Sequence, residues 1–323
     1  MNVERDLPVA GRPEPSRLAA FRARLGIYRK PTILALSILG CVLTWWLYVV
    51  LPATPHFDSK VGFDAYAYWL VNPAHPYQVP LGDLGSFTYS PAFAQLVSPA
   101  HLISFDVFFA MWDTFLFLNL VWLTKRMSLA WLVFLPVSLE LFHGNVHLLL
   151  ATVCVLGFDY PALWSIGILT KLTPGVSLLW FVVRREWRSL AWALGVTAAV
   201  SAVSFAIDPG AWWDWVKFLT TSNATGAGSN DWYSYLFPPL WARIAAAALL
   251  VVWGARTDRR WVVPVATAIA MPVIWVTTPA ILMAIPRLRG RFPPAGRVEA
   301  ADEAADVAAP SGGKLGRIGR LLG

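Results

Sequence analysis

Charged residues and cysteines are both scarce in this sequence of 323 residues. Only 14% of its residues are charged and two are cysteine, whereas 57% are hydrophobic and the mean hydropathy is +0.55. Because a soluble globular protein carries about 25% charged residues, this composition excludes that class and indicates an integral membrane protein. Cys41 and Cys154 both lie in apolar runs, where we expect a small hydrophobic role and neither a disulfide nor a metal site.

Several motifs of soluble enzymes are absent as well. The sequence contains no P-loop, GxGxxG, HExxH or CxxC element, and no acidic pair with the spacing of a nucleotide-sugar metal site. These absences argue against an enzyme that uses a soluble nucleotide donor and against a metalloenzyme. We therefore predict no metal and no cofactor.

The clearest membrane span is residues 33–51, a charge-free run long enough to cross a bilayer as a helix. Arginine and lysine are concentrated in the 30 residues before it, so the positive-inside rule places the N-terminus in the cytoplasm and the following loop outside. Further basic clusters mark the ends of apolar segments at Lys125-Arg126, Arg184-Arg185-Arg188, Arg256-Arg259-Arg260 and Arg287-Arg289-Arg291. We interpret the net charge of +7 as a topology signal and expect no nucleic-acid partner.

Apolar segments recur from residue 89 to residue 286, many of them short and interrupted by proline. This pattern predicts an all-α, polytopic membrane protein with roughly 9–11 membrane segments, some of them broken or re-entrant around a cavity. In one interpretation, residues 89–103 re-enter without crossing, which leaves all four later basic clusters inside. In the alternative, residues 89–103 cross the membrane and residues 160–184 form one long helix.

The chain divides into three parts. Residues 1–30 form a basic cytoplasmic tail, and residues 31–286 form the membrane-embedded domain with outer loops at 53–88 and 208–236. Residues 287–323 are rich in Ala, Pro and Gly, which predicts a disordered cytoplasmic tail. We expect a multi-pass protein of the plasma membrane with both termini in the cytoplasm.

The first outer loop carries carboxylates among aromatic rings, a combination suited to sugar binding and proton abstraction. Asp58 and Asp64 are its candidate catalytic acids, and Asp83 is a weaker one. The aromatic residues of the second outer loop suit either an interfacial belt or another wall of the same site. The expected sugar-binding or acceptor-binding residues are Tyr66, Tyr68, Trp69, Tyr77, Tyr89, His143, Asn145 and Trp232.

Several separate motifs resemble one family. The run Asp64-Ala65-Tyr66, with Asn72-Pro73, Pro76-Tyr77 and Phe87-Thr88-Tyr89-Ser90-Pro91 after it, is similar to the first-loop pattern of glycosyltransferase family 87, the actinobacterial polyprenol-phosphate-mannose-dependent mannosyltransferases. Gly144-Asn145-Val146-His147-Leu148-Leu149 resembles that family's Gly-Gln-x-Asn-Leu-Leu element. Lys171-Leu172-Thr173-Pro174 resembles its Lys-x-x-Pro segment. The family's late Ser-Pro-x-Ser-Trp-x-His element corresponds here to residues 271–277, which lack the histidine.

The resemblance implies a GT-C-type membrane enzyme that takes a sugar, mannose first, from a polyprenyl monophosphate and transfers it with inversion to a glycolipid or glycan acceptor at the outer face. Asp64 matches the family motif and is the expected general base, with Asp58 as its rival. Lys171 and Arg243 are the expected phosphate ligands. Membrane lipids are the other expected partners.

Alternatives stay open at this level. The donor sugar could be arabinofuranose, and the same broken helices would suit a transporter or a catalytically inactive scaffold. Glu140 with His143 or His147 suits either a polar relay or hydrogen bonding between helices. For Lys171, snorkelling to an interface is the structural alternative.

Overall fold

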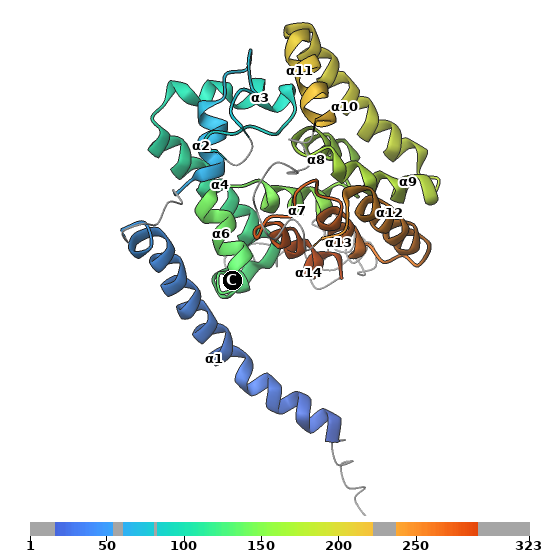
Figure 1. The fold of residues 1–323 in the computed structure, drawn as a ribbon. Helices are drawn as coiled ribbons and strands as arrows, with labels where there is room; N and C mark the ends of the chain where they lie inside the picture. Colours follow the sequence, from blue (N-terminus) through green and yellow to red (C-terminus); the bar gives the residue numbers. More distant parts are fainter. Residues whose placement is uncertain (1–16, 54–60, 81–82, 222–236, 290–323) are drawn as a thin grey trace, which may run out of the picture.

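The structure, a computed structural model, describes residues 17–53, 61–80, 83–221 and 237–289, with side chains described from residue 29 onward. Helices and loops account for all of these residues, and no strand occurs among them (Figure 1). The α-helices are α1 (Arg17–Trp45), α2 (Phe63–Leu70), α3 (Pro91–Val97), α4 (Phe105–Thr124), α5 (Ser128–Trp131), α6 (Leu135–His143), α7 (His147–Leu156), α8 (Trp164–Thr170), α9 (Leu179–Val183), α10 (Trp187–Ile207), α11 (Pro209–Thr220), α12 (Leu240–Arg256), α13 (Val262–Ile269) and α14 (Ile285–Leu288).

Shorter helical turns extend several of these elements. A π-helical turn, Trp46–Val50, continues α1. The 3₁₀ turns are Ser98–Leu102, Lys125–Met127, Pro161–Leu163, Thr173–Leu178 and Thr278–Ala284.

The predicted all-α membrane class is confirmed. Within the described ranges, three helical stretches are long and apolar enough to cross a membrane: Arg29–Val50, Phe105–Trp131 and Trp187–Ile207. A fourth span results if α6 and α7, which meet at a bend of 111°, are counted together. The other apolar helices are shorter, so the larger number of segments expected from the sequence remains a prediction.

The structure distinguishes the two topological interpretations of the middle of the chain. Residues 91–102 form only α3 and one 3₁₀ turn, whereas a crossing helix needs about 20 residues. The stretch 160–184 is not one long helix, because it breaks after α8 at Lys171, whose backbone is extended (φ −141°, ψ 110°). The alternative with a continuous helix is therefore wrong, and the broken-helix interpretation is favoured.

Helix α1 runs away from the rest of the molecule and packs near its C-terminal end against α5 (Figure 1). Gly40 makes this contact possible, since a Cβ atom there would collide with the backbone carbonyl of Leu129. The Tyr48 hydroxyl then donates to Asp113 Oδ2 of α4 over 3.1 Å. A small residue and an interhelical hydrogen bond thus join helices in the way expected inside a bilayer.

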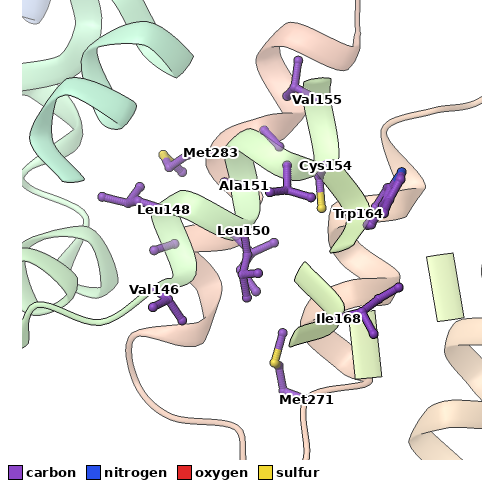
Figure 2. Close-up of a cluster of buried hydrophobic side chains, with 14 of the residues drawn as sticks. Val146, Leu148, Leu150, Ala151, Cys154, Val155, Trp164, Ile168, Met271 and Met283 are labelled. Carbon is purple, nitrogen blue, oxygen red and sulfur yellow. The ribbon is translucent and has the colours of Figure 1, made fainter. Parts of the chain in front are cut away.

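The core is built around α7, which is buried on nearly all sides. Figure 2 shows Leu148, Leu150, Ala151, Cys154 and Val155 of this helix among side chains from α8 and from the segment containing Met271 and Met283. A helix that is apolar all round is a core helix. Its position between early and late parts of the chain fixes the α6–α7 bend, where the polar residues of the candidate site gather.

Candidate active site at the α6–α7 bend

Two glycines bring α2 against the bend between α6 and α7. Gly144 ends α6 in the left-handed region (φ 69°), and a Cβ atom there would lie 2.7 Å from Ala65 Cβ of α2. Gly62, also left-handed (φ 75°), precedes α2 and donates its N–H to Phe142 O over 2.7 Å. Glycine adopts this conformation without steric cost, so both positions allow an approach that a larger residue would block.

This approach places Asp64, in the first turn of α2, beside Asn145. Asn145 Nδ2 donates to Asp64 Oδ2 over 2.8 Å, and Asn145 Oδ1 accepts the N–H of Val146 over 2.7 Å. The two bonds fix the orientation of the amide, because one needs a donor and the other an acceptor. Asp64 is half-buried, so its carboxylate is held by the protein while part of it remains accessible.

Glu140 holds the bend itself. Its side chain is completely buried, and its Oε1 accepts the N–H groups of His147 and Leu148, the latter over 3.1 Å. Its Oε2 lies 2.9 Å from His147 Nδ1, which is also 3.3 Å from the Thr277 hydroxyl. A carboxylate at the start of a helix satisfies N–H groups that have no partner within the helix. Of the two alternatives that the sequence left open for Glu140, a polar relay or hydrogen bonding between helices, the second describes its contacts with α7.

Lys171 reaches the same region from the break after α8. The N–H of Ser90 donates to Leu169 O over 3.2 Å, which joins the first loop to the end of α8. Lys171 Nζ then lies 4.3 Å from the centre of the Tyr89 ring, a cation–π contact. Within the described part of the chain, the ion pairs closer than 4.0 Å do not include Lys171.

The charges of Asp64 and Lys171 act on each other. Burial raises the pKa of Asp64, and the positive charge of Lys171 opposes this rise. Burial lowers the pKa of the Lys171 ammonium, and the negative charge of Asp64 opposes this fall. The fold therefore brings the two groups into one electrostatic neighbourhood, although 107 positions separate them in the sequence (171 minus 64).

Lys171 also lines a narrow pocket with a cavity volume of about 60 Å³, which we call the lysine pocket. Its lining residues are Thr88, Thr170, Lys171, Leu172, Trp215, Phe218, Leu219, Met271, Pro272, Val273 and Trp275. Most of these side chains are apolar, and Lys171 is the one charged residue among them. The pocket suits a ligand with an apolar part and a negatively charged group.

Part of this pocket comes from a segment that the sequence presented as an outer loop. Residues 209–220 of the expected loop 208–236 form α11, which contributes Trp215, Phe218 and Leu219. The Asp208 side chain accepts the N–H of Ala211 over 3.1 Å, and a proline follows at the first helical position. Asp followed by Pro is a helix-start signal, so this helix could have been found from the sequence.

The other expected site residues divide into two groups. Tyr89 contacts Lys171, and Tyr68 and Tyr77 contact Tyr89: the hydroxyls of Tyr68 and Tyr89 are 2.7 Å apart, and Tyr77 donates to Tyr89 O over 2.8 Å. Tyr66 and Trp69 instead pack on Phe105 at the start of α4, and Trp69 Nε1 donates to Ile103 O over 2.9 Å.

Three further expected residues remain. His143, the last residue of α6, packs edge-to-face against Phe63 and Phe142. Asp58 and Trp232 lie outside the described residues.

Arg243 of α12 was also expected to bind phosphate. Its Nε donates to Pro238 O over 2.9 Å, its NH2 donates to Pro272 O over 2.8 Å, and its NH1 donates to Ile269 O and Met271 O. These bonds occupy four of the five guanidinium N–H groups and hold the backbone at one wall of the lysine pocket. Arg243 therefore supports the wall, and its expected phosphate contact remains a prediction.

The fold and site define an all-α membrane protein with a carboxylate and a lysine that converge beside an apolar pocket. The family model of glycosyltransferase family 87 matches residues 87–301, which is more than half of the chain. The chain therefore belongs to glycosyltransferase family 87. The matched span includes Asn145 and Lys171 and begins after Asp64. No curated protein and no solved structure matches the chain.

Proposed function

We propose that this glycosyltransferase transfers a sugar, with mannose as the first candidate, from a polyprenyl monophosphate to a glycolipid or glycan acceptor at the outer face of the plasma membrane. The proposal is supported by the mutual electrostatic influence of Asp64 and Lys171 and by the position of Lys171 in the lining of the lysine pocket. The Asp64 carboxylate can accept a proton, and the Lys171 ammonium can bind an anion. The apolar lining is the surface expected for a lipid-linked donor.

In the proposed reaction, Asp64 removes the proton from an acceptor hydroxyl as its oxygen attacks the anomeric carbon of the donor sugar. The bond between that carbon and the phosphate oxygen breaks, and the electron pair leaves with the polyprenyl phosphate. Attack from the side opposite the phosphate inverts the anomeric configuration. Lys171 stabilises the charge that develops on the leaving phosphate.

The surroundings of both residues support these roles. Burial raises the pKa of Asp64, which makes its carboxylate a stronger base than an exposed aspartate. Asn145 holds one carboxylate oxygen and thereby orients the group. The contact of Lys171 with the Tyr89 ring leaves its charge unneutralised, as a phosphate-binding lysine requires.

The test is a transfer assay with the purified protein in lipid nanodiscs. The protein is incubated with an extract of envelope lipids and with radiolabelled polyprenyl-phosphate-mannose or polyprenyl-phosphate-arabinose, and empty nanodiscs supply the background. We expect labelled glycolipid from the mannose donor. Product from arabinose alone would correct the donor, and product from neither donor would favour a transporter or a scaffold.

A further inference from the structure

A second hollow lies beside the lysine pocket and shares Phe218 of α11 with it. We call it the polar pocket, and its cavity volume is about 290 Å³. Its lining residues are His75, Tyr77, Gln78, Asp214, Lys217, Phe218 and Thr221. The first three come from the loop after α2, and the others come from α11 and the residue that follows it.

The lining of the polar pocket mixes hydrogen-bond donors and acceptors. Gln78 and Thr221 can each do both, Asp214 accepts and Lys217 donates. The single carboxylate and the single ammonium balance each other, which argues against a strongly anionic ligand. In the part of the chain that the structure describes, no group of three or more His, Cys, Asp or Glu side chains could hold a metal ion.

Two aromatic rings in contact with each other line the polar pocket. The rings of Tyr77 and Phe218 stack with their centres 5.3 Å apart and an angle of 16° between their planes. An aromatic face next to polar groups of both kinds is the arrangement that a sugar ring needs, since it has apolar C–H faces and a rim of hydroxyls. Burial raises the pKa of the Tyr77 hydroxyl, and the negative charge of Asp214, which lines the same pocket, adds to this rise.

The same aromatic pair joins the two pockets. Phe218 lines both of them, and the Tyr77 hydroxyl donates to Tyr89 O over 2.8 Å. The Tyr89 ring in turn makes the cation–π contact with Lys171. The polar pocket therefore adjoins, at Phe218, the pocket that Lys171 lines.

We propose that the polar pocket binds a sugar ring of the acceptor, through hydrogen bonds to Gln78 and Asp214 and stacking on Tyr77 and Phe218. The identification of this ligand as the acceptor rests on the proposed function. The binding of a sugar ring can be measured without any transfer reaction.

The test measures binding of methyl α-mannopyranoside by saturation-transfer difference NMR, with the protein in lipid nanodiscs. The variant Gln78→Ala/Asp214→Asn removes the amide of Gln78 and the negative charge of Asp214. It is expected to weaken binding by about tenfold, because the lost hydrogen bond contributes roughly a factor of five in affinity and the neutral acceptor contributes about a factor of two less than the charged one. Asp106→Asn is the matched control, since Asp106 is an exposed carboxylate at the start of α4 and lines neither pocket. It should leave binding unchanged.

Two results would overturn the inference. One is equal binding of the glycoside by the double variant and the control, and the other is displacement of the glycoside by inorganic phosphate, which would mark an anion site. The donor assay is run on the same preparations. The protein could bind the glycoside through Gln78 and Asp214 and still turn over neither donor. This result would contradict the proposed function and would support the sugar-binding pocket.

Discussion

The α6–α7 bend and the lysine pocket use charged side chains in opposite ways. At the bend, Glu140 is completely buried and both of its carboxylate oxygens have partners. In the lysine pocket, Lys171 contacts an aromatic ring and lies outside ion-pair distance of the described carboxylates. Saturated hydrogen bonding marks a group that holds the fold, whereas a charge without a close counterion at a pocket marks a group that can bind a ligand.

Asp64 shares one feature with each of these two regions. One oxygen is fixed by Asn145, as in a structural contact, and the residue is only half-buried, as a reacting group must be. The comparison therefore makes separable predictions. Changes at Glu140 should act mainly on stability, and changes at Lys171 should act mainly on donor binding and turnover.

The largest effect on stability is expected from Glu140→Ala. It leaves the N–H groups of His147 and Leu148 without their acceptor, and each such buried group costs about 1–3 kcal/mol. Thermal unfolding in detergent should show a clear fall in Tm. Glu140→Gln is the matched control, because its amide oxygen can still accept both N–H groups, and its Tm should fall much less. Equal melting of both variants and the parent protein would show that Glu140 does not hold the bend.

Lys171→Ala should reduce kcat/KM for the lipid-linked donor by about 10–100-fold, because a hydrogen bond to a charged group contributes about 1.5–3 kcal/mol. Lys171→Arg keeps the positive charge and should retain more activity. Initial rates at several donor concentrations give kcat/KM for both variants. If the alanine variant melts like the parent protein and transfers sugar at the same kcat/KM, Lys171 only snorkels to an interface.

Asn145→Ala removes the hydrogen bond that orients Asp64 and should lower kcat by about tenfold, equivalent to roughly 1.4 kcal/mol. The effect should fall on kcat and leave the donor KM nearly unchanged, because Asn145 is absent from the lining of the lysine pocket. A change in KM alone would indicate that Asn145 contacts the donor.

The pH dependence should show the coupling between Asp64 and Lys171. A general base must be ionised, so kcat/KM should rise with pH through the pKa of Asp64, and burial places that pKa above the ordinary aspartate value. Removal of the Lys171 charge also removes an influence that lowers this pKa. The acidic limb of Lys171→Met should therefore move to higher pH. An unchanged limb would mean that the two charges do not interact.

The sequence was sufficient for the helical membrane class, because apolar runs and clustered basic residues determine it locally. It also identified Asp64, Asn145 and Lys171 separately, from motifs. Their convergence could not be derived, since it depends on the left-handed turn at Gly144 and on the break at Lys171. The capping role of Glu140 was missed in the same way, because its partners belong to the next helix.

Other features escaped the sequence for different physical reasons. The carbonyl oxygens around Arg243 could not be foreseen, because a sequence does not show where backbone groups lack partners. Helix α11 falls within residues 208–236, which the sequence presents as an outer loop. Its start signal at Asp208 and Pro209 was present and would have predicted it.

The most direct test of the central claim compares Asp64→Asn with Asp58→Asn in the transfer assay, after size-exclusion chromatography has shown that both proteins are folded. The first change keeps the shape of the side chain and removes the base. It should reduce the rate of sugar transfer by about 10²–10⁴-fold, while Asp58→Asn stays within a few-fold of the parent rate. Transfer at the parent rate by Asp64→Asn, together with loss of transfer in Asp58→Asn, would contradict the account and make Asp58 the base.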